Sequence, residues 1–149
     1  HTGVRIAKSA NIPSANICMN CHSSIQNVGG QTGMSPEIKK IYDAVESGTP
    51  IEWVRIHNLP DLAYFNHSQH VAVGGLECQT CHGEIQEMEV VYQYANLTMG
   101  WCINCHRETE VNSKGNEYYA KLVELHGETS KNPLKVQDIG GLECSKCHY

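Results

Sequence analysis

The chain has 149 residues, of which 40% are hydrophobic but only 7% are aromatic, and its formal net charge is −5. Its 11 lysines and arginines are scattered, so the sequence offers no basic surface for nucleic acid. It contains no run of 18 or more apolar residues, which excludes a transmembrane helix within these residues.

All eight cysteines belong to one repeated motif, Cys-x-x-Cys-His. The four copies are Cys18-Met19-Asn20-Cys21-His22, Cys78-Gln79-Thr80-Cys81-His82, Cys102-Ile103-Asn104-Cys105-His106 and Cys144-Ser145-Lys146-Cys147-His148. This motif is the attachment sequence of a c-type haem. The two thiols form thioethers with the porphyrin, and the adjacent histidine is delivered to the iron. The sequence therefore predicts four covalently attached haem c groups, each with its motif histidine as one axial ligand.

Two other uses of paired cysteines stay open as alternatives. Cys-x-x-Cys pairs build zinc ribbons, but a ribbon needs no histidine directly after each pair. Eight cysteines also suit a disulfide scaffold, but a histidine after every pair would then be a coincidence. We therefore favour haem attachment at all four motifs.

Four haems would replace the aromatic core that the composition lacks, because porphyrin faces are large, rigid and apolar. The predicted fold is accordingly a haem-cored multihaem cytochrome c, mostly coil with a few short α-helices and little β. The length suits a single domain over residues 1–149.

A loop and a helix are expected in the first third of the chain. Residues 1–17 are polar and predict a loop that leads to the first motif. In that loop His1 is either an axial ligand or an exposed residue, and we favour the exposed residue. A helix is predicted over residues 36–47, because Ser35-Pro36 is a typical helix start and Gly48 a typical stop.

Three histidines precede the second motif. His57 lies in a predicted extended segment, residues 51–63, and is either a distal axial ligand or a packed, hydrogen-bonded histidine. We favour the ligand. His67 and His70 are three residues apart, so on a helical turn they share one side. One imidazole cannot serve two irons, so each is predicted to bind a separate haem; the alternative is an exposed polar turn.

Between the second and third motifs, residues 87–94 are β-prone and predict a short strand or hairpin arm. Met88 and Met99 could in principle be axial ligands, as in single-haem cytochromes. Five histidines outside the motifs are enough for four irons, so both methionines are expected in the core.

After the third motif, a helix is predicted over residues 117–126, with Gly127 ending it. His126 continues its apolar edge, and we favour an axial ligand over a residue that only stabilises the helix dipole. Residues 139–144, Ile-Gly-Gly-Leu-Glu-Cys, nearly repeat residues 73–78, Val-Gly-Gly-Leu-Glu-Cys. The repeat predicts two copies of one turn, each leading into a motif.

The segment Phe65-Asn66-His67-Ser68-Gln69-His70, followed by Cys78-x-x-Cys81-His82, resembles the opening unit of class III multihaem cytochromes c. In that family the first histidine ligates the haem that follows, and the second ligates a later haem. The resemblance implies that His67 pairs with His82 and that His70 pairs with His106.

A wider resemblance covers nearly the whole chain, and its segments are similar to the pentahaem cytochrome subunit of bacterial alternative complex III. They are Asn58-Leu59-Pro60-Asp61, residues 64–70, Glu87-Met88-Glu89-Val90-Val91, Leu97-Thr98-Met99-Gly100-Trp101-Cys102 and Gly140-Gly141-Leu142-Glu143-Cys144. That family has five haems, whereas this chain has four motifs. The difference and the start at His1 lead us to expect a missing N-terminal portion, with a fifth haem and a membrane anchor. His1 or His57 would then be free to serve that haem.

Haems with two histidine ligands lack an exchangeable position, which favours electron transfer over catalysis by this chain. Alternative complex III is a membrane complex that oxidises quinol. The resemblance therefore implies iron-sulfur and other complex subunits as partners, and a monohaem cytochrome or an oxidase as the acceptor. It places the chain on the periplasmic side of the bacterial cytoplasmic membrane, where c-type haems are attached. A free periplasmic shuttle and a multihaem reductase are the alternatives, and the reductase would need an iron with an open position.

Overall fold

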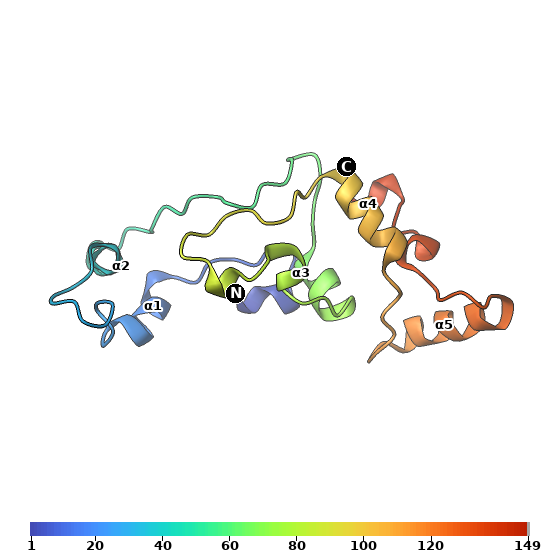
Figure 1. Cartoon of the computed structure of the whole chain (residues 1–149), viewed down its shortest axis with the longest axis horizontal. Helices are drawn as coiled ribbons and strands as arrows, with labels where there is room; N and C mark the ends of the chain where they lie inside the picture. The colour runs from blue at the N-terminus through green and yellow to red at the C-terminus, as the bar shows by residue number, and fades with distance from the viewer. Residues whose placement is uncertain (149) are drawn as a thin grey trace. The chain divides into compact units, whose positions relative to one another are not determined.

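The computed structural model describes residues 1–148, which form two separate units. The first unit contains His1 and Asn11–Arg55. The second contains Thr2–Ala10 and the chain from Ile56 onward. In both units short helices are joined by long extended segments (Figure 1). The described residues contain two isolated β-bridges, Ala63 with His148 and Glu110 with Lys135, but no named strand.

The first unit is built from two helices, α1 (Ala15–His22) and α2 (Pro36–Ser47), which pack against each other. The prediction for α2 is confirmed, with Pro36 in the first turn and Gly48 in the left-handed conformation at the C-terminal end. The predicted loop over residues 1–17 is only partly right. The short 3-10 helix η1 (Thr2–Arg5) and the beginning of α1 both lie within it.

The second unit holds η1 and all the helices that follow α2, all of them short. After η1 they are, in chain order, η2 (Gln69–Val73), a π-helix, then α3 (Gln79–His82), η3 (Ile85–Glu87), α4 (Met99–Glu108), α5 (Glu117–Thr129), η4 (Val136–Ile139) and η5 (Cys144–Lys146). The two longest of these helices, α4 and α5, begin with a side-chain cap. The side chain of Thr98 accepts a hydrogen bond from the N–H of Trp101, and that of Asn116 accepts one from the N–H of Tyr119.

Two local predictions in this unit are wrong. The region of residues 87–94 contains no strand: the end of η3 and an irregular segment take its place. Helix α5 does not end at Gly127 but continues to Thr129. Nothing lies within 4 Å of where a side chain at Gly127 would begin, so the glycine sits on an open helix face and costs stability without ending the helix.

The near-repeat at residues 73–78 and 139–144 is matched in outline only. Each copy follows a short helix and leads into a motif, as expected. The left-handed residue is the second glycine, Gly75 (φ +72°), in the first copy but the first glycine, Gly140 (φ +87°), in the second. The two turns therefore differ in backbone conformation, because η2 is a π-helix and η4 is a 3-10 helix.

The polypeptide buries very little of its own apolar surface. Only Ala95 and Leu134 are buried hydrophobic residues among those described, and the exposed surface is 11091 Å². One compact protein of 16.5 kDa would expose about 7,500 Å², and two separate compact bodies of these sizes would expose about 9,000 Å². Met99, expected in the core, is 63% exposed. The predicted fold class is confirmed: the chain is mostly coil with short helices, and its side chains form almost no core of their own.

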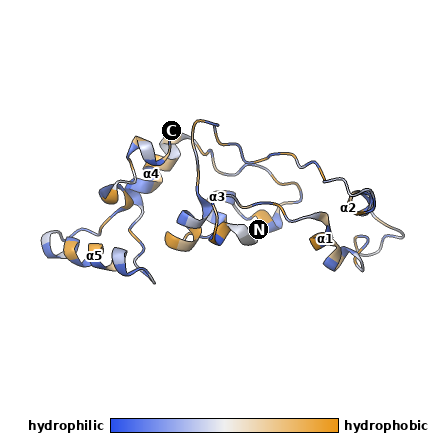
Figure 2. Ribbon diagram, turned by 180° about the vertical axis from the view of Figure 1, so that it is seen from behind, coloured by the Kyte–Doolittle hydropathy of each residue, from blue (hydrophilic) through white to orange (hydrophobic). Residues whose placement is uncertain are grey.

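Hydrophobic residues are spread along the short helices and extended segments (Figure 2), and many of them are exposed. On α5, for example, Tyr118 is 69% exposed and Leu125 is 46% exposed. These side chains form a surface that large apolar groups, not neighbouring helices, would cover. None of the described helices is long and apolar enough to cross a membrane.

Candidate haem centres

Each of the four motifs lies on a helical turn. The first ends α1, the second ends α3, the third lies within α4, and η5 covers part of the fourth. On a helix, residues at i, i+3 and i+4 share one side. The spacing of Cys-x-x-Cys-His therefore puts both thiols and the imidazole of each motif on the same side, as attachment to a single porphyrin requires.

All eight cysteines are free thiols. The described residues contain no group of three or more His, Cys, Asp or Glu side chains that could hold a metal ion. A zinc ribbon needs four such side chains around one ion and a disulfide needs a bonded pair of cysteines, and the described residues show neither arrangement. The donor set instead consists of separate pairs of thiols, each next to one histidine.

Three of the four motif histidines leave the same ring nitrogen, Nε2, available for a ligand. In three of them the Nδ1 atom contacts a main-chain carbonyl: His22 with Ile25 at 2.9 Å, His106 with Gly141 at 2.6 Å and His148 with Leu62 at 3.1 Å. A carbonyl only accepts, so Nδ1 must carry the proton and Nε2 keeps its lone pair. Metal-binding histidines typically have this arrangement, because the outer hydrogen bond fixes both the tautomer and the ring orientation.

The rings of His70 and His106 lie close together. Their ring centroids are 6.1 Å apart and their planes differ by 26°. Two imidazoles on opposite sides of one metal, each with a metal–nitrogen bond of about 2 Å, would have centroids about 6 Å apart. His70 also donates Nδ1–H to a carbonyl, that of Asn66, at 2.8 Å. The pairing of His70 with His106, implied by the family resemblance, is thus one that the structure brings together.

His67 lies near His82 and has the same outer hydrogen bond. Its Nδ1 atom is 2.9 Å from the carbonyl oxygen of Lys8. Burial lowers the pKa of His82, and the nearby imidazoles of His57 and His67 lower it further. Burial also lowers the pKa of His70. A lowered pKa keeps an imidazole neutral, and only the neutral form binds a metal.

The other three histidines differ in which nitrogen is engaged. In the first unit, Nδ1 of His1 contacts the carbonyl oxygen of Asn11 at 2.5 Å, which leaves Nε2 available. His126 instead uses Nε2, 3.1 Å from the carbonyl oxygen of Asn132. Nε2 of His57 is 3.0 Å from Nδ1 of His82. Burial lowers the pKa of His57.

The three motifs of the second unit are neighbours in space. Burial raises the pKa of the Cys81 thiol, and the thiols of Cys105 and Cys102 raise it further. The pKa of Cys102 is also raised by burial, and next by Cys147. Electrostatic repulsion of this kind acts only over short distances. The third motif therefore lies between the second and the fourth.

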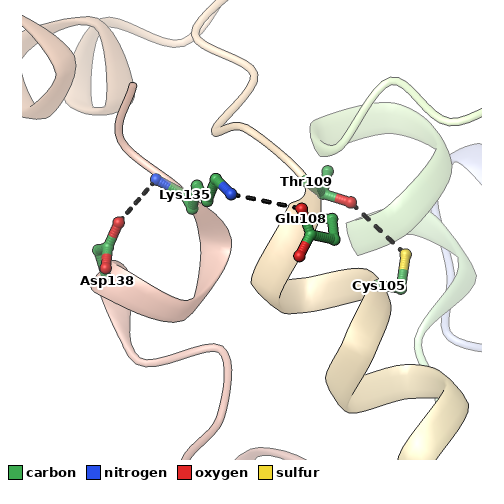
Figure 3. Close-up of polar contacts among 5 residues, drawn as sticks. All are labelled: Cys105, Glu108, Thr109, Lys135 and Asp138. Atoms are coloured by element: carbon green, nitrogen blue, oxygen red, sulfur yellow. Dashed lines mark hydrogen bonds and ion pairs between the residues drawn. The ribbon is translucent and has the colours of Figure 1, made fainter. Parts of the chain in front are cut away.

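Helix α4, which carries the third motif, is tied to the segment that begins η4. Lys135 Nζ is 3.5 Å from Glu108 Oε2, and Lys135 N–H donates to Asp138 Oδ2 at 2.9 Å (Figure 3). Cys105 Sγ lies 3.5 Å from the Thr109 hydroxyl at the end of α4 (Figure 3). Main-chain bonds join the same segments, from Val111 N–H to the carbonyl of Leu134. These links hold Gly141, whose carbonyl orients His106, at a fixed place beside α4.

Sequence reasoning missed Tyr42, which positions the first motif. Its hydroxyl donates a hydrogen bond to the carbonyl oxygen of His22 at 2.8 Å and accepts one from Gln26 Nε2 at 3.1 Å. Tyr42 lies in α2, for which the sequence predicted a helix but no functional residue. Its hydroxyl, which usually finds a hydrogen-bond partner, was the available signal.

The comparisons with known proteins agree with this geometry. No protein-family model matches the chain. The chain is similar to the multihaem cytochrome c subunit of a menaquinone reductase from Nitratidesulfovibrio vulgaris Hildenborough, with 27% identity over 140 residues. The match covers 93% of this chain and 53% of that protein, so the chain spans about half the length of the curated relative it matches. The similarity supports a multihaem cytochrome c, but it does not single out alternative complex III.

Proposed function

We propose that this chain transfers single electrons through covalently attached c-type haems, one at each of the four motifs. The observation that carries the proposal is the common state of three motif histidines, His22, His106 and His148. In each, Nδ1–H donates a hydrogen bond to a main-chain carbonyl, and Nε2 is left for an iron. The near absence of buried side chains supports it further, because four porphyrins would supply the missing core.

The residues have separate roles in this proposal. The eight motif cysteines attach the porphyrins, and the four motif histidines orient and ligate the irons. His67 is the second ligand opposite His82, and His70 is the second ligand opposite His106. His1 is the candidate beside His22, because these are the two histidines of the first unit. His126 is the candidate for His148 and would have to give up its bond to Asn132.

A haem with two histidine ligands supplies one-electron redox chemistry without an exchangeable coordination site. The chain's own contribution is to hold three of the attachment sites side by side in the second unit. That adjacency, in which the Cys81 thiol lies near those of Cys102 and Cys105 and the Cys102 thiol lies near that of Cys147, suits electron relay.

We further propose that the relay works within a quinone-linked membrane complex. The similarity to a menaquinone reductase subunit supports this setting. The family resemblance supports a more specific one, alternative complex III, in which electrons from quinol arrive through an iron-sulfur subunit. A monohaem cytochrome or an oxidase would then accept them. The location would be the periplasmic side of the bacterial cytoplasmic membrane.

In a second candidate function the electrons flow in the opposite direction, from the haems to menaquinone. The observation that favours it is the relative itself, which is a subunit of a menaquinone reductase. The two candidates predict different reactions of the native complex. Quinol with an oxidised cytochrome c tests the first, and a reduced periplasmic cytochrome with a menaquinone analogue tests the second.

The test begins with the chain produced together with a c-type haem maturation system. Intact-mass analysis is expected to show four covalent haems, and EPR is expected to show low-spin iron throughout. A chain without covalent haem, or with mainly high-spin iron, would overturn the proposal. Purification from native membranes then tests the setting, since a freely soluble protein without an iron-sulfur subunit would support the shuttle alternative.

A further inference from the structure

The side chains of His57 and His82 are in direct contact. Nδ1 of His82 lies 3.0 Å from Nε2 of His57. The two rings meet edge to face, with centroids 4.3 Å apart and planes at 82°. In the other three motifs the histidine's Nδ1 contacts a main-chain carbonyl. His82 is therefore the motif histidine whose outer hydrogen bond goes to a side chain.

The direction of this hydrogen bond follows from the proposed function, on which the inference rests. If Nε2 of His82 binds an iron, the proton of that ring is on Nδ1, and Nδ1–H donates to Nε2 of His57. The same bond occupies Nε2 of His57. This nitrogen is therefore engaged by His82, and His57 is not placed as a ligand through it.

Both histidines are held by one segment, residues 93–96. The side chain of Gln93 accepts a hydrogen bond from Asn58 N–H at 3.1 Å, directly after His57. Its amide nitrogen donates to the carbonyl of Ala95, a buried residue, at 3.0 Å. The ring of Tyr94 packs on Gly83, directly after His82, so closely that a Cβ there would lie 2.8 Å from it. Residues 93–96 therefore contact the chain directly after each of the two histidines, through Gln93 at Asn58 and through Tyr94 at Gly83.

We propose that His57 is a positioning residue for His82, acting as the hydrogen-bond acceptor that orients its ring and strengthens its donation to the iron. An imidazole nitrogen is a more basic acceptor than a peptide carbonyl. An outer-shell acceptor of this kind raises the basicity of the ligand and so favours the oxidised iron. The haem of Cys78 and Cys81 is thereby given a lower midpoint potential than it would have without His57.

The test is a redox titration of the protein carrying all of its haems, in the wild type and in three variants. His57→Phe removes the acceptor and keeps a ring in its place. His57→Gln keeps an acceptor oxygen near the position of Nε2 and is the matched control. Gln93→Met leaves His57 in place but removes its anchor at Asn58. The haems of the other three motifs are internal references, because their histidines bond to main-chain carbonyls.

His57→Phe is expected to shift one midpoint potential upward and leave all haems low-spin in EPR. In His57→Gln most of this shift should be absent, and Gln93→Met should give a smaller shift in the same direction as His57→Phe. Unchanged potentials, or equal shifts in the Phe and Gln variants, would overturn the proposal. So would a high-spin iron that binds carbon monoxide in His57→Phe, because His57 would then itself be an axial ligand. If His57→Phe does not mature, the sign of the Gln93→Met shift decides. A wild-type chain without covalent haem would refute the proposed function and with it the role of His57, whereas the outcomes above would refute the role of His57 alone.

Discussion

The two nitrogens of each histidine ring have different tasks in this chain. Nδ1 is used for hydrogen bonds to the chain itself in His22, His67, His70, His106 and His148, and Nε2 is left for a ligand. This division needs no special side chain, because the acceptors are main-chain carbonyls. Those of His22 and His70 lie within four residues of the histidine, whereas those of His106, His67 and His148 are 35, 59 and 86 residues away. The division fixes the orientation of each ring before any metal is bound.

His67 and His70 are expected to serve different haems. His70→Ala should open the iron ligated by His106, since these two rings face each other at 6.1 Å. His67→Ala should open the iron ligated by His82. In each variant one haem in four should become high-spin and bind carbon monoxide, measured by EPR and absorption spectroscopy. The two difference spectra should add in the double variant; if both single variants open the same haem, the assignment is wrong.

The free energy of unfolding is expected to fall as the pH falls below 6.5. Burial lowers the pKa of His57, His70 and His82 below the ordinary value of 6.5, which applies to the unfolded chain. Below that pH the unfolded chain binds protons that the folded chain does not, so protonation favours unfolding. Guanidinium titrations of the protein with its haems at about pH 7.5 and about pH 5.5 test this, because carboxylates stay mostly ionised in that window. Equal or greater stability at the lower pH would contradict it.

At the scale of elements, glycines and short helices decide where each histidine points. Gly141 is the clearest case, because its carbonyl accepts the hydrogen bond from His106 Nδ1–H and its α-carbon lies against η4. A Cβ at this position would be 2.6 Å from the carbonyl oxygen of Val136 and would also clash with Cγ1 of that residue. The turn therefore has room only for glycine.

Gly141→Ala is expected to destabilise the protein, by about 1–3 kcal/mol as for other overpacked sites. Displacement of the turn should also disturb the EPR signal of the haem ligated by His106. Gly127→Ala is the matched control, because nothing lies within 4 Å of a Cβ there. In α5 that change should stabilise by about 0.5–1 kcal/mol. Thermal unfolding compares the two variants, and equal melting temperatures would refute the argument about space at Gly141.

At the scale of the whole molecule, the polypeptide does not make its own core. With Ala95 and Leu134 as the buried hydrophobic residues among those described, apolar burial cannot offset the entropy of ordering so many loop residues. Under the proposed function the haems would compensate, because covalent attachment reduces the freedom of the unfolded chain and the porphyrins supply apolar surface.

The haem-free chain is therefore expected not to fold. Produced in the cytoplasm without a haem maturation system, it should lack a cooperative thermal transition by circular dichroism and be digested rapidly by protease. The same chain with attached haems should resist protease and unfold cooperatively. A haem-free chain that shows a cooperative transition would contradict the absence of a side-chain core.

The sequence by itself determined the attachment motifs, α2 and the start of α5, because these depend on residues close together in the chain. A fixed spacing of Cys, Cys and His defines a motif, and a Ser-Pro start with a glycine stop defines a helix, without reference to distant residues. The low aromatic content also predicted correctly that the fold would be mostly coil with little β.

Only the tertiary structure decided what each remaining histidine contacts. Sequence reasoning favoured an axial ligand at each of three histidines, but their contacts differ. His57 contacts His82, His67 bonds through Nδ1 to the carbonyl of Lys8, and His126 bonds through Nε2 to the carbonyl of Asn132. These partners are up to 59 residues away in the chain. Which ring nitrogen remains free depends on such distant contacts and on turns whose backbone differs even between near-identical sequences. Local patterns carry no information about either, because hydrogen-bond partners are chosen by the path of the whole chain.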